Sequence, residues 1–230
     1  MNLKKLFFKH EFSIESLLDL LFLFADKVSI IQVGANDGQL CDPIRKYVLQ
    51  NKVSGIMLEP QNAVFLRLKE NYASTSGISF VNAALSDVVG ETILYSVKDA
   101  VVLECPDMSG VASFSKKHVE KELKSNLHHL IKSKTTNIQD LIFESVVPTV
   151  TYTKLLSEHE MASLDMLLID AEGFDYQSIM LFPLDKLKPK SIIYEYKHMS
   201  SSEYKELEEY LVRMGYKPYY TKNDALFILG

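Results

Sequence analysis

A glycine-bearing turn and a downstream acid are the residues of this chain most clearly arranged for chemistry. The segment 34–38, Gly-Ala-Asn-Asp-Gly, follows the apolar run 30–33, and Glu59 closes the next apolar run 21 positions after Gly38. Small residues where a strand turns into a helix let the backbone approach a ligand closely, and an acid at this distance can accept hydrogen bonds from ribose hydroxyls. The pattern predicts that a nucleoside-bearing cofactor binds across the ends of two adjacent parallel strands.

A second cluster places three acids around a glycine, directly after a buried apolar run. The run 166–169 is followed by Asp170, Glu172 and Asp175, with Gly173 between the last two. At the carboxyl edge of a sheet such acids can orient a cationic cofactor, accept a proton or hold a metal ion. We expect functional roles for Asp170 and Glu172. Asp175 is expected instead to favour the positively polarised N-terminus of the following helix.

The composition is that of an ordinary globular protein. With 230 residues, 47% of them hydrophobic and 24% charged, the chain fits one α/β domain over residues 1–230. Its net charge of −5 offers no general affinity for nucleic acid. Cys41 and Cys105 are too few for a disulfide framework and lack a CxxC neighbour. We therefore expect reduced thiols and a cytoplasmic location.

The N-terminal segment has only a superficial likeness to a signal peptide. Lysines precede the apolar stretch 17–24, but Glu11, Glu15 and Asp19 interrupt the pattern. The stretch is also shorter than the roughly 20 apolar residues that span a bilayer. We expect no membrane span and interpret residues 1–27 as a leading helical segment packed on the sheet. An interfacial amphipathic anchor is the alternative.

Short apolar runs alternate with helical patterns along the chain, which is typical of a mostly parallel sheet covered on both faces. The predicted strands are 28–33, 55–58, 78–81, 166–169 and 191–196, and the predicted helices are 43–51, 62–73 and 203–214. Two further runs, 216–221 and 225–229, are predicted to form a closing antiparallel hairpin. The sequence thus predicts an α/β fold.

Residues 87–147 break this alternation, and about 98–147 are assigned to an insertion. Residues 92–97 alternate like a strand, and a loop-like segment and a long polar stretch follow. We interpret the region as a lid inserted across the top of the sheet, without an apolar core of its own. His118, His128 and His129 lie in it and are expected to face solvent or to belong to the lid. Adjacent histidines on a helix point in different directions, so no metal site is predicted there.

The motifs together resemble those of the FkbM-type methyltransferases, in the class I S-adenosylmethionine-dependent superfamily. The resemblance covers about residues 29–196 and rests on the segments 32–38, 59–60, 82–87 and 170–175. It implies a Rossmann-like, seven-stranded, mostly parallel sheet with helices on both faces and a reversed last strand. It also implies S-adenosylmethionine as the cofactor.

One residue departs from the superfamily pattern. Gln32 stands where many members carry an acid that holds the cofactor's amino group. The Gln32 side-chain carbonyl can still accept a hydrogen bond from that group. The charge contact must then come from another residue, for which Asp37 and Asp170 are the candidates.

The resemblance further implies where the cofactor contacts the chain. Backbone amides of the 34–38 turn would face its methionine and ribose parts, Glu59 would accept hydrogen bonds from both ribose hydroxyls, and residues after the third strand would flank its adenine. The implied cofactor-binding residues are Gln32, Gly34, Ala35, Asn36, Asp37, Gly38, Glu59, Pro60, Asn82, Ala83, Ala84, Ser86 and Asp170. For Asn82 and Ser86, a turn that hydrogen-bonds its own backbone is an equal alternative.

The expected reaction is methyl transfer to a hydroxyl of a sugar, glycan or secondary metabolite, and this acceptor class comes from the resemblance alone. The candidate catalytic residues are Asp170, Glu172 and His198. Asp170 is expected to help seat the cofactor, and Glu172 or His198 to draw the proton from the acceptor hydroxyl. His198 follows the predicted strand 191–196 at the ligand edge, and the ordinary pKa of histidine suits proton transfer near neutrality.

Three other readings remain open at this stage. The first is a non-catalytic cofactor-binding or interaction module on the same fold. The second is a metal-assisted methyltransferase in which Asp170, Glu172 or Asp175 holds a divalent cation. The third is a nicotinamide-dependent oxidoreductase, against which the 170–175 cluster and the closing hairpin argue.

Overall fold

The computed structural model describes residues 13–23, 25–40, 42–127 and 137–230. The interpretations given above for Cys41, His128 and His129 concern residues outside these ranges, as does the first part of the leading segment. Within the described ranges, every helix is too short or too polar to cross a lipid bilayer.

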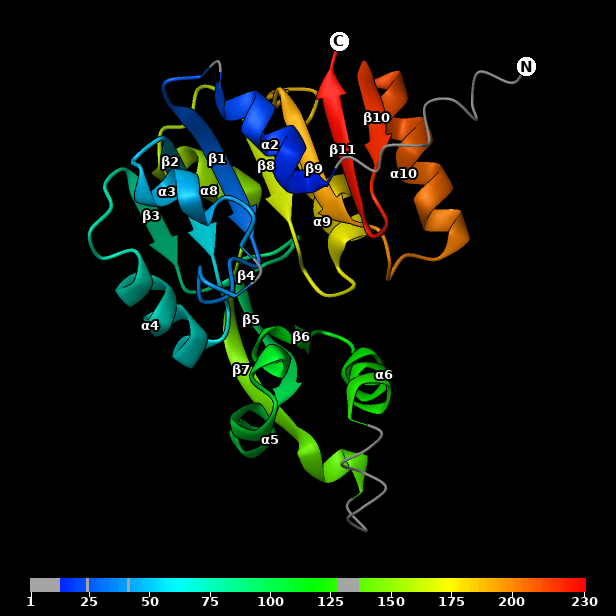
Figure 1. Ribbon diagram of the computed structural model, residues 1–230. Coiled ribbons are helices and arrows are strands. Elements are labelled where there is room, and N and C mark those ends of the chain that lie inside the picture. Colours follow the sequence, from blue (N-terminus) through cyan, green and yellow to red (C-terminus); the bar gives the residue numbers. More distant parts are fainter. Residues whose placement is uncertain (1–12, 24, 41, 128–136) are drawn as a thin grey trace.

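A seven-stranded sheet forms the centre of the molecule (Figure 1), with the order β10-β11-β9-β8-β1-β2-β3. All neighbouring strands are parallel except β11, which is antiparallel to both β9 and β10. The strands are β1 (Val28–Val33), β2 (Val53–Leu58), β3 (Ile78–Val81), β8 (Met166–Ile169), β9 (Ser191–Glu195), β10 (Tyr216–Tyr220) and β11 (Asp224–Leu229). The predicted seven-stranded sheet and its closing antiparallel hairpin are confirmed.

Alternating residues of the strands divide the core between the two faces of this sheet. Ile30 belongs to a buried cluster with helices α2 (Ile14–Leu23), α3 (Arg45–Leu49) and α4 (Asn62–Asn71). Its neighbour Ile31 belongs to the opposite cluster, with α8 (Tyr152–Glu158), α9 (Asp175–Leu181) and α10 (Ser201–Arg213). Each fully buried aliphatic side chain stabilises the fold by about 1.5–3 kcal/mol. The double layer of helices fixes the carboxyl ends of β1, β2, β8 and β9 along one edge.

A smaller sheet of order β4-β7-β5-β6 stands beyond that edge (Figure 1). Its strands are β4 (Ala84–Leu85), β5 (Gly90–Val97), β6 (Ala112–Ser113) and β7 (Ile142–Val150). The helical pieces between them are α5 (Asp99–Glu104), η1 (Pro106–Gly110), α6 (Lys116–Asn126) and η2 (Ile138–Leu141). We call residues 90–150 the insertion. It starts and ends beyond the predicted 98–147 because β5 and β7 pair along their whole lengths.

The expectation that this region lacks an apolar core is wrong. Val97, Val101, Met108 and Val119 are buried together with residues of α6 and β7 in a cluster separate from the main core. The sequence hides this cluster because each element contributes only one to three apolar residues to it. On α6, for example, Val119 and Leu123 are four positions apart in an otherwise polar helix, so they lie on one face.

Candidate functional site

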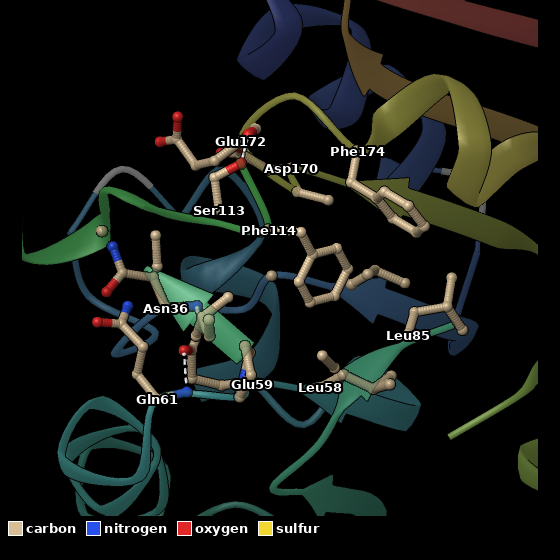
Figure 2. A pocket seen from close by; sticks show the side chains of 18 of the residues that line it. Asn36, Leu58, Glu59, Gln61, Leu85, Ser113, Phe114, Asp170, Glu172 and Phe174 are labelled. Atoms are coloured by element: carbon tan, nitrogen blue, oxygen red, sulfur yellow. Dashed lines mark hydrogen bonds between the residues drawn. The ribbon is translucent and has the colours of Figure 1, made fainter. Parts of the chain in front are cut away.

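Two cavities meet at the carboxyl edge of the main sheet, beneath the insertion. The first lies over β1, β2 and β4 and is lined on its far side by insertion residues (Figure 2). The second lies over β1, β8, β9 and β11 and reaches α2 and α6. Five residues line both cavities, so the two form one continuous site: Gly34, Asn36, Gly110, Asp170 and Glu172.

The turn after β1 brings the chain unusually close to the turn after β8. Gly34 has a φ of +78°, and a Cβ at this position would lie 1.9 Å from the Asp170 backbone oxygen. Only glycine fits there. Asn36 and Glu172, which both line the two cavities, have positive φ values of 48° and 46°. Non-glycine residues in this conformation are uncommon and often mark functional turns.

Glu59 lies at the end of β2, under the turn that follows β1. Its Oε2 accepts a hydrogen bond from the Asn36 backbone N–H at 3.1 Å, and its Oε1 accepts one from the Gln61 N–H at 2.8 Å. Burial raises the pKa of Glu59 to about 7, although these amides oppose the shift. The Asn82 side-chain amide donates to the Glu59 and Pro60 backbone oxygens at 2.8 and 3.1 Å, and thereby fixes the segment that carries the carboxyl.

The far end of the first cavity is apolar. Ala83, Ala84 and Leu85 line it from the main body, and Leu94 and Phe114 line it from the insertion. The Phe114 ring meets the ring of Phe174 edge-on, with centroids 5.0 Å apart (Figure 2). The remaining space is about 90 Å³, well below the roughly 300–1,000 Å³ of ligand pockets. The insertion therefore lies partly closed over a slot whose walls suit a flat ring.

The second cavity is larger, about 640 Å³, and acidic. Among the described residues it is lined by eight carboxyl groups and one lysine: Glu15, Asp42, Asp107, Glu122, Asp170, Glu172, Glu195, Asp224 and Lys197. Gln32 also lines it, and its buried Oε1 has no hydrogen-bond partner within the described structure. A buried acceptor of this kind costs about 1–3 kcal/mol unless a ligand satisfies it.

Asp170 and Glu172 stand on the wall between the two cavities, and Asp175 does not. Burial, with repulsion from Glu172 and Asp175, raises the pKa of Asp170 well above its usual value. Asp175 accepts hydrogen bonds from the Ala171 and Gly173 backbone N–H groups at 3.4 and 3.2 Å. Its carboxyl closes the turn at the start of α9, in agreement with the structural role expected for it.

The insertion touches the main body through polar contacts around this wall. The Gln61 side-chain amide donates to the Ser109 backbone oxygen at 3.3 Å, and Ser113 Oγ donates to the Glu172 backbone oxygen at 2.9 Å (Figure 2). Gly110 packs so closely that a Cβ there would meet the Asn36 side-chain nitrogen at 2.7 Å. These contacts position the insertion directly over the shared wall.

His198 lies behind Glu172 and does not line either of the two described cavities. Its side chain is 3% exposed, and its Nε2 is 3.0 Å from Glu195 Oε2. This hydrogen bond raises the pKa of His198 above its ordinary value. His118 of α6 packs against it edge-on, with ring centroids 4.5 Å apart. Of the two placements expected for His118, it takes the one within the inserted segment: it lies on α6, and its side chain is only 11% exposed, so it does not face solvent.

Four of the implied cofactor-binding residues lie outside the described linings of both cavities. The Asp37 carboxyl accepts from the Gln39 and Leu40 N–H groups, so it closes its own turn. A Cβ at Gly38 would meet the Tyr72 ring at 2.4 Å, which makes Gly38 a packing residue. Ser86 Oγ contacts Asp87 in a turn, and Asn82 acts on the backbone of 59–60 as described above. The other implied residues line one cavity or both.

The sequence predicted a lid in this region, but it did not predict which residues of the insertion reach the site. Gly110, Ser113, Phe114 and His118 reach the wall or the first cavity only because the insertion folds back over the sheet edge. One local signal exists for this placement. Ser115 caps α6 by accepting from the His118 N–H, which predicts a helix start there, although not the surface that the helix contacts.

Comparisons with known proteins agree with this architecture. A family model, the methyltransferase FkbM domain, matches residues 32–218. Among solved structures, methyltransferase FkbM from Methylobacillus flagellatus KT is 11% identical, with a TM-score of 0.53 over 89% of this chain and 44% of that chain. A putative caffeoyl-CoA O-methyltransferase from Staphylococcus aureus is also 11% identical, with a TM-score of 0.50 over 94% of this chain and 82% of that chain. A comparison with curated proteins gave no match.

These results carry different weights. At 11% identity the structural likenesses show the fold alone, and this chain spans less than half of the Methylobacillus protein. The family match is stronger, because it runs from Gln32, two residues before the glycine turn, to residue 218 in the first strand of the closing hairpin. The resemblance read from the sequence is therefore confirmed: the chain belongs to the FkbM methyltransferase family, whose cofactor is S-adenosylmethionine.

Proposed function

We propose that this protein is an S-adenosylmethionine-dependent O-methyltransferase acting on a hydroxyl of a sugar, glycan or secondary metabolite. The observation that supports it most is the shared wall. A narrow slot lined by the buried acid Glu59 and a larger polar cavity meet at Asp170 and Glu172. A methyl donor whose nucleoside occupies the first cavity would extend across this wall towards Gln32, and an acceptor in the rest of the second cavity would meet it there.

The first cavity suits the nucleoside part of the cofactor. Glu59 is the ribose-binding residue in this proposal, since its carboxyl lies between the turns after β1 and β2. The apolar walls at Ala84, Leu85 and Phe114 would enclose the adenine. Gln32 Oε1, which is buried and has no partner among the described residues, would accept a hydrogen bond from the cofactor's amino group. The Asp170 carboxyl would balance the positive charge of that amino group.

The second cavity would select the acceptor by charge. Burial raises the pKa of Asp42, Asp170 and Asp224, but the other five carboxyls still outnumber the one lysine, so the cavity repels anionic groups and favours neutral molecules rich in hydroxyl donors, or molecules that also carry an amine. This charge supports a glycan or a polyhydroxylated metabolite and disfavours phosphates, carboxylates and nucleic acids.

Glu172 is the proposed proton acceptor. S-adenosylmethionine, when bound, would supply a methyl group on a positively charged sulfur; the acceptor oxygen would bond to the methyl carbon as the carbon–sulfur bond breaks, leaving S-adenosylhomocysteine. Glu172 lines both cavities and would take the hydroxyl proton as the oxygen–carbon bond forms. His198 lies behind it and would act by positioning Glu172, because the structure does not bring His198 to the cavity surface.

The test combines binding with transfer. Calorimetry with S-adenosylhomocysteine should show one site, and isotope-labelled S-adenosylmethionine should deliver methyl groups to members of an acceptor panel. The panel should contain neutral, amine-bearing, carboxylated and phosphorylated glycans, with detection by mass spectrometry. Transfer confined to anionic acceptors would contradict the charge argument. A folded protein that binds neither cofactor form would overturn the proposed function.

A further inference from the structure

Three side chains from three separate elements converge behind the shared wall. His118 comes from α6 of the insertion, Glu172 from the turn after β8, and His198 from the loop after β9. Each offers one ligand atom, and these atoms all lie within 4.8 Å of one another. Glu172 Oε2 is 3.2 Å from His118 Nε2 and 3.9 Å from His198 Nε2.

This spacing is close to that of ligands on a common ion. Two ligand atoms that each lie about 2.1 Å from a metal are roughly 3–3.5 Å apart. The His118–Glu172 pair is already at this separation, the His198–Glu172 pair is within about an ångström of it, and the ligand atoms of the two histidines are at most 4.8 Å apart, so the rings must close in on the ion. Two imidazoles with one carboxylate suit divalent transition metals such as zinc, and do not suit Mg²⁺ or Ca²⁺, which take oxygen ligands.

The surroundings of His198 resemble the second layer of a metal site. Its Nε2 faces the Glu172 and Glu195 carboxyls, whereas its Nδ1 faces Glu122 Oε1 at 3.9 Å. The Nδ1 atom is buried and has no hydrogen-bond partner among the described residues. A metal-ligating histidine commonly presents its second nitrogen to a carboxylate, which fixes the ring orientation. Glu122 is 8% exposed, and a movement of about an ångström would bring its Oε1 within hydrogen-bond distance of that nitrogen.

Charge favours a cation at the same point. The three carboxyls of Glu122, Glu172 and Glu195 surround the two imidazoles. Lys197 lies beside this group, with its Nζ 3.9 Å from Glu195 Oε1. A divalent ion would offset this negative charge. Glu195, 3.0 Å from His198 Nε2, could supply a fourth ligand once the ion displaces that hydrogen bond.

We propose that His118, Glu172 and His198 bind a divalent transition-metal ion, with Zn²⁺ as the representative case, and that the ion fastens the insertion to the sheet edge. One ligand belongs to the insertion and two belong to the main body, so a bound ion holds α6 over the shared wall. The site does not require the cofactor. It engages Glu172 through Oε2, the carboxyl oxygen that lies 3.2 Å from His118 Nε2 and 3.9 Å from His198 Nε2.

Metal titration of the full chain tests this directly. The protein is freed of metal with a chelator, dialysed, and titrated with Zn²⁺ by calorimetry and with Co²⁺ by visible absorption. We expect one ion per chain and cobalt bands that report nitrogen and oxygen ligands. Loss of an outer partner alone weakens metal binding 10–100-fold, so His118→Ala should weaken it at least about 100-fold. His118→Asp, which keeps a ligand, should retain part of the affinity.

A histidine elsewhere in the structure serves as the matched control. His159 follows α8 and is not one of the clustered ligands, so His159→Ala should bind Zn²⁺ as the unaltered protein does. Hydrogen exchange supplies a second readout: Zn²⁺ should slow exchange in α6 of the unaltered protein but not of His118→Ala. Equal Zn²⁺ affinity in His118→Ala and unaltered protein, or no binding to either, would overturn the site and leave a hydrogen-bonded His–Glu network. Unimpaired binding of S-adenosylhomocysteine in the same samples would keep the proposed function intact.

Discussion

Replacing Glu59 with glutamine should remove a pH dependence of cofactor binding that this buried carboxyl creates. Glu59 is 4% exposed, and burial raises its pKa from 4.5 to about 7. Ribose hydroxyls that donate to the carboxylate would stabilise its charged form and lower that pKa again. Binding of S-adenosylhomocysteine should therefore release a proton below about pH 7, and the affinity should rise with pH.

The magnitude follows from the fraction of Glu59 that is ionised in the free protein. With a pKa of about 7, about one-eleventh is ionised at pH 6 and about ten-elevenths at pH 8. The affinity should thus increase about tenfold, or about 1.4 kcal/mol, between these values. The Glu59→Gln protein loses a charged acceptor, which should cost about 1.5–3 kcal/mol at pH 8. The difference in affinity between the two proteins should shrink towards pH 6, because Glu59 is then mostly protonated in the unaltered protein.

Calorimetry in two buffers of different ionisation enthalpy measures both the affinity and the number of protons released. The unaltered protein should release nearly one proton more per bound ligand at pH 6 than Glu59→Gln does. Asp170 lines the same cavity and has a raised pKa, but its contribution is common to both proteins and cancels in the difference. Identical pH slopes and proton counts in the two proteins would refute the assignment of Glu59 to the ribose.

Further substitutions probe the wall and the turns. Without added metal, Glu172→Gln should slow methyl transfer about 10²–10⁴-fold while the affinity for S-adenosylhomocysteine stays nearly unchanged. Asp170→Asn should lower both the rate of transfer and the affinity. Normal turnover by Glu172→Gln would mean that alignment of donor and acceptor is enough for catalysis without this base. Gly34→Ala should lower the free energy of unfolding in urea by at least about 1–3 kcal/mol, because the added Cβ would lie 1.9 Å from the Asp170 backbone oxygen. Gly90→Ala is the control and should be tolerated, because its Cβ would have its nearest contact at 3.9 Å. Burial raises the pKa of Asp175 from 3.8 to about 7, so the folded state holds this proton more tightly than the unfolded chain, and the free energy of unfolding should fall as the pH rises from about 4 to about 7. Asp175→Asn should flatten that part of the stability curve, and an unchanged curve would show that the carboxyl titrates normally.

The sheet and half of the site could be read from the sequence because they depend on local patterns. Each apolar run ends at a residue such as Gly34, Glu59 or Asp170, and parallel strands bring these ends to one edge. The other half depends on how a separate unit docks, which no local pattern records. His118 lies 54 positions from Glu172, and its polar helix reads as a solvated face until α6 is placed over the wall.

The shared wall has a thermodynamic consequence. Gly110 belongs to the insertion and lines both cavities, so any shift of the insertion reshapes both together. If an acceptor draws the insertion inward and thereby tightens the methyl donor's binding by some factor, the donor must tighten the acceptor's binding by the same factor. With S-adenosylhomocysteine bound in the donor site, unidentified acceptors could then bind tightly enough to be detected. Screening for the natural substrate in its presence is therefore more sensitive than screening the free protein.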